Sequence, residues 1–164
     1  MRILGIDHGT RTGWSLAIDG IVVKTGSFQM KNPTKNTGKA FMDFLQFVDT
    51  LLDETKPDLV RLEKPAHMRN ANILRYLVGL HSMAELACCK HNIPVKDIIP
   101  SQYKKQIAGD GRADKDGVLY ALLKKGIPKE FIYKPVFYKT DKQKIKELKY
   151  DESDATALAL FKEE

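Results

Sequence analysis

The chain has 164 residues, of which 43% are hydrophobic, and it carries a formal net charge of +6. This length suits one domain, and this hydrophobic fraction excludes a chain that is disordered throughout. The sequence has no run of eighteen apolar residues, which excludes a membrane-spanning helix. We therefore expect a single folded domain over residues 1–164, with no membrane partner.

The positive charge is concentrated in one segment. Residues 124–149 contain nine lysines and three acidic residues, so this segment alone accounts for the net charge of the chain. Such a basic surface favours a polyanionic partner, most often nucleic acid. A solvated lysine-rich loop is the alternative interpretation.

The two cysteines, Cys88 and Cys89, are adjacent and badly placed to form a disulfide with each other. The first residues run directly into Asp7 without a signal-peptide pattern. Both observations predict a protein of the reducing cytoplasm.

In chain order, short apolar or alternating runs predict strands over residues 2–7, 14–18 and 21–28, with Asp19-Gly20 as a hairpin turn. A polar loop at 31–38 precedes an amphipathic helix that Pro57 ends. The apolar face of this helix consists of Phe41, Phe44, Leu45, Val48, Leu51 and Leu52.

A fourth strand over residues 59–62 precedes a helix over 70–92, whose apolar stripe consists of Ile73, Leu77, Leu80, Ala84 and Ala87. A fifth strand is expected over 94–99, with helices near 101–107 and 115–124. We expect residues 128–150 to be irregular and basic, and a last helix to begin near Glu152. The inward-facing residues of this helix are Ala155, Leu158, Ala159 and Phe161.

The order of elements predicts an α/β fold. Its mixed five-stranded sheet has three antiparallel strands and then two parallel ones, with helices on both faces.

Four acidic residues occupy positions where their carboxylates could meet. Asp7 and Glu63 end the first and fourth strands, and Asp151 and Asp154 share one face of the last helix. Each has an ordinary alternative as a turn former, a strand-end charge or a helix cap. Gathered together, such carboxylates would bind Mg²⁺ or Mn²⁺, and two such ions suit phosphate chemistry.

These residues lie in four motifs that resemble those of RuvC-type Holliday junction resolvases, a family with an RNase H-like fold. The motifs occur in the family's order at residues 5–14 (GIDHGTRTGW), 62–63 (LE) followed by 68–71 (MRNA), 109–115 (GDGRADK) and 151–159 (DESDATALA).

The resemblance implies a homodimeric endonuclease that nicks four-way or other branched DNA symmetrically in recombination and repair. Hydrolysis would leave 5′-phosphate ends and need two Mg²⁺ or Mn²⁺ ions but no small-molecule cofactor. Asp7, Glu63, Asp151 and Asp154 would be the catalytic metal ligands, and Lys115 would be a further catalytic group. The setting would be the cytoplasm of a bacterium or a phage-infected host.

The DNA-binding residues would be Arg69, Lys104, Lys105, Arg112, Lys115, Lys139 and Lys142. The helix over 70–92 would form the dimer contact, because Leu74, Val78, Met83 and Leu86 give it a second apolar side. A helix buried on most sides is the alternative.

The chain departs from the family at residues 64–67 (KPAH), which lack the aromatic wedge that the family places after its glutamate. The segment over 128–150 instead offers Tyr133, Phe137 and Tyr138 among lysines, which could track a DNA strand by stacking or pack in the core. These features suit a phage-type member acting on several branched DNAs.

Three rival functions remain open. An RNase H-like nuclease that processes RNA would carry the same acids. An ATP-binding phosphotransferase of the actin and Hsp70 type is suggested by residues 7–10 (DHGT), although the chain is short for its two domains. A junction-binding protein without catalysis is the third.

Overall fold

The computed structural model describes residues 1–30, 36–65, 70–132, 134–140, 143–149 and 151–162, and for residues 134–140, 143–149 and Asp151 it describes the backbone alone. Its main sheet has five strands in the order β3-β2-β1-β4-β5. They are β1 (Arg2–Asp7), β2 (Arg11–Ile18), β3 (Ile21–Gln29), β4 (Leu59–Glu63) and β5 (Val95–Ile98).

The first three strands pair antiparallel, and β4 and β5 run parallel to β1. The turn between β2 and β3 has positive φ at both Asp19 and Gly20, which is the backbone that a two-residue hairpin requires. The predicted mixed sheet is confirmed.

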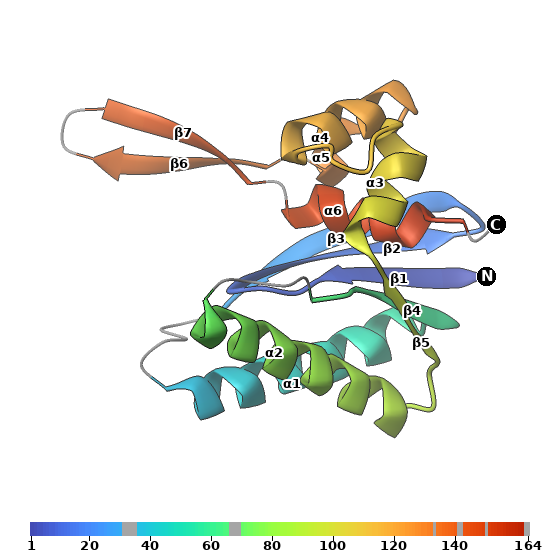
Figure 1. Ribbon diagram of the computed structural model, residues 1–164, viewed down its shortest axis with the longest axis vertical. Coiled ribbons are helices and arrows are strands. Elements are labelled where there is room, and N and C mark those ends of the chain that lie inside the picture. The colour runs from blue at the N-terminus through green and yellow to red at the C-terminus, as the bar shows by residue number, and fades with distance from the viewer. Residues whose placement is uncertain (31–35, 66–69, 133, 141–142, 150, 163–164) are drawn as a thin grey trace.

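Helices cover both faces of this sheet (Figure 1). On one face lie α1 (Thr37–Thr55) and α2 (Ala71–Lys90). On the other lie α3 (Pro100–Ala108), α4 (Lys115–Lys124), α5 (Lys129–Ile132) and the closing helix α6 (Asp151–Leu160).

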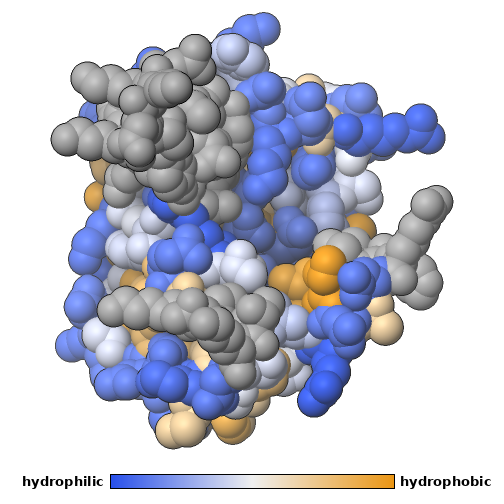
Figure 2. All heavy atoms as spheres, turned by 90° about the vertical axis from the view of Figure 1, so that its left-hand side faces the viewer, coloured by the Kyte–Doolittle hydropathy of each residue, from blue (hydrophilic) through white to orange (hydrophobic). Residues whose placement is uncertain are grey.

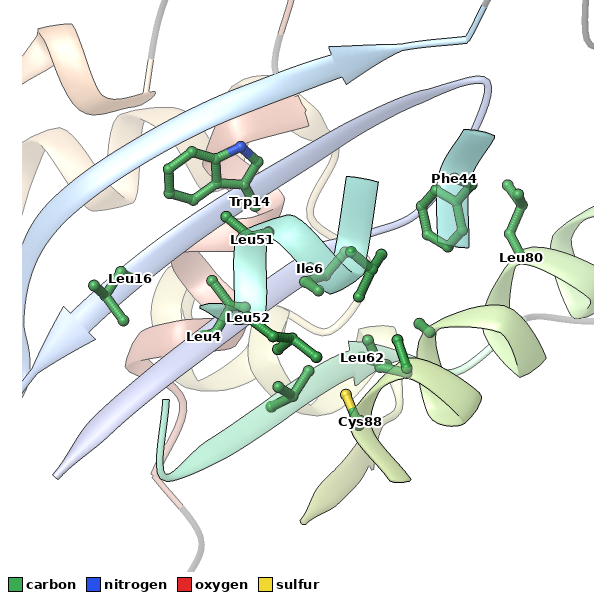
Figure 3. Packing of buried hydrophobic residues seen from close by; sticks show 14 of the residues in the cluster. Leu4, Ile6, Trp14, Leu16, Phe44, Leu51, Leu52, Leu62, Leu80 and Cys88 are labelled. Atoms are coloured by element: carbon green, nitrogen blue, oxygen red, sulfur yellow. The ribbon is translucent and has the colours of Figure 1, made fainter. Parts of the chain in front are cut away.

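The face toward α1 and α2 is apolar because side chains alternate along each strand. Leu4 and Ile6 of β1 and Leu62 of β4 point to this side, where they pack with Phe44 and Leu52 of α1 (Figure 3). All five are at most 1% exposed. Burial of this apolar surface provides the main driving force for folding.

The opposite face receives α6 at close range. A β-carbon added to Gly5 would lie 2.2 Å from the carbonyl oxygen of Ala155 and 2.7 Å from the backbone nitrogen of Ala159. Only a glycine on the central strand therefore permits this approach. The carboxyl end of α6 is held by Arg61 of β4, whose guanidinium donates to the carbonyl oxygens of Ala159, at 3.3 Å, and Phe161.

The segment at residues 128–150 differs from the irregular structure that we expected. It contains α5 and an antiparallel hairpin of β6 (Lys134–Thr140) and β7 (Gln143–Lys149), which projects away from the main sheet in Figure 1. Valine and aromatic residues at 136–138 favour a strand, and the two halves pair across a short connection. Lysine content alone was therefore a poor guide to the backbone.

The apolar stripe of α2 is buried only in its second half. Leu80, Ala84 and Ala87 are fully buried, whereas Ile73 is 48% exposed. Among the described residues, no helix is long and apolar enough to cross a membrane.

Candidate active site

Two acids that are distant in the sequence meet at one buried hydroxyl. The Tyr103 side chain of α3 is 1% exposed, and its Oη donates to Glu63 Oε2 at 2.7 Å. The same hydroxyl lies 3.5 Å from Asp154 Oδ1. The Glu63 carboxylate of β4 and the Asp154 carboxylate of α6 therefore lie near each other, although they belong to different layers of the fold. The sequence predicted that these acids would meet.

Asp7 ends β1 on the same face. Leu4 and Ile6 point to the apolar face, so the alternation of β1 directs Asp7 toward α6. The charges of Asp154, Glu63 and Asp7 all raise the pKa of the Tyr103 hydroxyl, although burial of the phenol is the largest cause. This phenol consequently stays protonated and remains a hydrogen-bond donor at neutral pH.

Lys115 lies at the edge of this group. Its Nζ is 3.8 Å from Asp154 Oδ2, and its side chain is 54% exposed while that of Asp154 is 5% exposed. The two oxygens of Asp154 thus face different neighbours, Tyr103 on one side and Lys115 on the other. A half-exposed ammonium in this place can also reach a bound phosphate.

The glycine-rich turn explains how Lys115 reaches Asp154. Gly109 ends α3 with φ of +80°, a conformation that L side chains rarely adopt. Asp114 then caps α4, because its Oδ1 accepts a hydrogen bond from the Gly117 nitrogen at 2.8 Å. Lys115 is therefore the first residue of α4, directly beside the closing helix.

The remaining predicted site residues fall into two groups. Lys104, Lys105 and Arg112 lie at the surface of α3 and of the turn that follows it. The structure does not describe Arg69 and Lys142, or the side chains of Asp151 and of Lys139 in β6. Residues 66–67 of the stretch at 64–67, where the family places its aromatic wedge, also lie outside the described residues.

A second group of potential metal ligands lies on the opposite face of the sheet. His81 Nε2 is 3.1 Å from Asp97 Oδ1 and 3.8 Å from Glu85 Oε1. The 3.1 Å contact is an ordinary distance between an imidazole nitrogen and a carboxylate oxygen, so direct side-chain contacts explain this group without a metal ion.

A hollow opens beside the turn that follows Asp7. Its volume is about 660 Å³, and its lining includes Gly9, Thr10, Ile73, Tyr76 and Leu77. Figure 2 shows this end of the molecule as a mainly hydrophilic surface with a compact hydrophobic patch beside a depression. This hollow therefore lies between the turn after β1 and the first half of α2.

Sequence reasoning missed two residues that organise this site. Tyr103 lies in α3, a helix in which only Lys104 and Lys105 were predicted to be functional. Arg61 interrupts the apolar strand β4. A charged residue inside a buried strand is a signal, because arginine is rarely buried without a partner. Here the partner is the end of α6, which positions Asp154.

The strand order, with carboxylates of β4 and α6 gathered on one face, defines a protein of the RNase H-like fold class. The family model described as crossover junction endodeoxyribonuclease RuvC matches residues 3–127. A relative of that name from Halorhodospira halophila is 34% identical over 126 residues, which cover 73% of each chain. Another from Parasynechococcus marenigrum is 28% identical and covers 76% of this chain and 82% of the relative.

Solved structures agree with the fold over nearly the whole chain. Thermus thermophilus RuvC in complex with a Holliday junction substrate superposes with a TM-score of 0.75 at 22% identity, covering 98% of this chain and 91% of that one. The yeast mitochondrial Holliday junction resolvase Ydc2 gives a TM-score of 0.64 at 14% identity, covering 98% and 75%. The chain belongs to the RuvC family of crossover junction endodeoxyribonucleases.

The family match ends at residue 127, well before α6 begins at Asp151. Asp154 therefore gains its place in the candidate site from its geometry, namely its burial and its contacts with Tyr103 and Lys115.

Proposed function

We propose that this chain is a Holliday junction resolvase, a metal-dependent endonuclease that nicks four-way and other branched DNA symmetrically. The observation that carries this proposal is the meeting of Glu63 and Asp154 at Tyr103, on the sheet face to which Asp7 also points, in a chain of the RuvC family.

The donor set fits divalent cations of the hard type. Asp7, Glu63 and Asp154 offer only carboxylate oxygens, which Mg²⁺ and Mn²⁺ prefer, and their mutual repulsion falls when a cation binds. Asp151 begins the same helix and is proposed as a fourth ligand. Two bound ions would activate a water molecule and neutralise charge on the scissile phosphate, and hydrolysis would leave a 5′-phosphate.

The chain's own residues have separate tasks in this scheme. The three carboxylates would hold the cations, and Lys115 would stabilise the negative charge that develops on the reacting phosphate. Lys105 and Arg112, which are exposed, and the partly buried Lys104 are proposed to contact the DNA backbone without reading its sequence. The hairpin of β6 and β7, whose sequence is rich in lysine, projects from the body and is proposed as a further DNA contact, with Lys139 among its residues.

A homodimer would match the two-fold symmetry of a four-way junction, and α2 is the proposed contact. Ile73, Val78 and Leu86 of this helix are 45–48% exposed, an unusual density of large apolar side chains on one surface helix. Cytoplasmic work in a bacterium or a phage-infected host accords with the free cysteines and the bacterial relatives.

The test is cleavage of a synthetic four-way DNA junction by the wild-type protein, beside a linear duplex and a structured RNA. Reactions contain Mg²⁺, Mn²⁺ or a chelator. We expect paired symmetric nicks in the junction, only with metal, that DNA ligase seals because each nick carries a 5′-phosphate and a 3′-hydroxyl. Cleavage of the RNA with the junction left intact would replace this proposal with an RNA-processing function.

A further inference from the structure

The Tyr103 hydroxyl occupies the point at which the β4 and α6 carboxylates come together. A phenol has one proton, and the 2.7 Å contact identifies Glu63 Oε2 as its acceptor. Asp154 Oδ1 is also within 3.5 Å of the same hydroxyl oxygen. One neutral donor thus sits between two acids that are 91 positions apart in the sequence.

The ring of Tyr103 has a separate structural task. It packs in the second apolar cluster of the protein, with Ile98 of β5, Ile107 of α3 and Leu119 of α4. Replacement by phenylalanine keeps this packing and removes only the hydroxyl. The contribution of the hydroxyl can therefore be measured apart from that of the ring.

Two adjacent carboxylates repel each other and tend to turn apart or to take up a proton. A hydrogen bond to one of them fixes its orientation and reduces its negative charge. Partners of this kind, which bind a metal ligand but not the metal, typically change metal affinity about 10- to 100-fold. The Tyr103 hydroxyl donates such a hydrogen bond to Glu63, and the buried ring fixes its position.

We propose that Tyr103 is a positioning residue of the nuclease site, whose hydroxyl holds the Glu63 and Asp154 carboxylates side by side in the orientation that binds divalent metal. This inference rests on the proposed function for its biological meaning. Its physical content, a preformed arrangement of two metal ligands, does not depend on which nucleic acid is cut.

The experiment compares wild type with Tyr103→Phe, and uses Tyr120→Phe as the control. Tyr120 lies on α4 and is 62% exposed, so its variant loses the same hydroxyl away from the acids. Mn²⁺ affinity is measured by calorimetry on the protein without DNA. We expect Tyr103→Phe to weaken Mn²⁺ binding about tenfold, and Tyr120→Phe to leave it unchanged.

Junction cleavage over a range of Mg²⁺ concentrations provides the second measurement. Tyr103→Phe should need about tenfold more Mg²⁺ for half-maximal cleavage and regain most of its rate at saturation. A lower melting temperature with unchanged Mn²⁺ affinity and Mg²⁺ requirement would show that the hydroxyl has only a structural role, and would overturn the proposal.

A double-mutant cycle with Glu63→Gln tests the route of the effect. If Tyr103 acts through Glu63, Tyr103→Phe should weaken Mn²⁺ binding much less in the Glu63→Gln background than in wild type. Equal weakening in both backgrounds would contradict the proposal.

The two proposals fail separately. If wild type cuts no nucleic acid but Tyr103→Phe still weakens Mn²⁺ binding, the nuclease function is refuted and the positioning role is retained. If wild type cleaves normally and Tyr103→Phe changes neither Mn²⁺ affinity nor the Mg²⁺ requirement, the positioning role is refuted and the nuclease function is retained.

Discussion

The two faces of the central sheet differ in chemistry, although they are formed by neighbouring residues of the same strands. On the face toward α1 and α2, Leu4, Ile6 and Leu62 form a closed apolar core. On the face toward α6, alternate positions of β1 and β4 hold Gly5, Arg61 and Glu63, and polar side chains are buried among backbone groups of the closing helix.

Titratable groups show the same contrast. On the apolar side, burial lowers the pKa of His8 to about 4 and raises that of Cys88 to about 12, so both are neutral at pH 7. On the polar side, buried Asp154 has Tyr103 and Lys115 as neighbours. The core of the α1–α2 face thus keeps its buried titratable groups neutral, whereas the α6 face surrounds buried charged groups with fixed partners, as a metal site needs.

The largest expected effect comes from adding a side chain at Gly5, where β1 and α6 lie in close contact. Gly5→Ala places a methyl group 2.2 Å from the Ala155 carbonyl oxygen, so the closing helix must move and take Asp154 with it. We expect a loss of more than about 2 kcal/mol of unfolding free energy, as in overpacked cores, and junction cleavage below one hundredth of wild type. Denaturant unfolding and the cleavage assay measure the two effects.

Gly38→Ala is the matched control, because a β-carbon at this position in α1 meets only Asn36 Oδ1 at 3.7 Å. It should keep full cleavage. If Gly5→Ala behaved like this control, the close approach of α6 would not position the site.

A smaller effect is expected when the Lys115 ammonium group beside Asp154 is removed. Lys115→Ala should slow cleavage about 10- to 100-fold, because the ammonium no longer stabilises charge on the phosphate. Lys124→Ala, at the exposed end of the same helix, should change the rate less than threefold, on the order of a weak surface contact. Single-turnover cleavage at saturating Mg²⁺ measures both rates, and equal losses would assign Lys115 to general electrostatic attraction.

The smallest effect concerns the reactivity of the cysteines on the α1–α2 face, and it leaves activity unchanged. Cys88 is buried and Cys89 exposed, so a thiol reagent should modify one thiol per native chain and two after denaturation. The protonated Cys88 thiol stabilises the fold fully below pH 9, and this contribution falls as the pH rises toward 12, because the unfolded chain releases its proton first. Rapid reaction of both thiols in the native protein would show that this face opens.

The sequence contains enough local information to predict the sheet and the acids. Alternation in residues 2–7 and the turn at Asp19-Gly20 depend on near neighbours, and these features are confirmed. Asp7 and Glu63 were predicted to meet from their places at strand ends, and the structure puts them on one face.

Other features depend on contacts between distant segments and could not be derived from a local pattern. Helix α6 was predicted, and Ala155, Leu158 and Ala159 are buried as expected. The burial of Glu152, Ser153 and Thr156 on its other sides was not predicted, because it depends on the elements packed around the helix. The Tyr103 contact joins three elements, and the hairpin at 134–149 was hidden by its lysines.

The most direct test of the α6 face as a metal-dependent nuclease site compares an aspartate on each face of the sheet, buried Asp154 and exposed Asp97. Asp154 lies beyond the family match, and Asp97 of β5 pairs with His81 on the other face. Junction cleavage in Mg²⁺ and junction binding in a chelator are measured for Asp154→Asn, Asp97→Asn and, as reference, Asp7→Asn.

We predict that Asp154→Asn, like Asp7→Asn, loses cleavage at least about a hundredfold while retaining junction binding, because the metal-dependent step depends on these carboxylates. Asp97→Asn should cleave at close to the wild-type rate. Full cleavage by Asp154→Asn, or an equal loss in Asp97→Asn, would contradict the assignment of catalysis to this face.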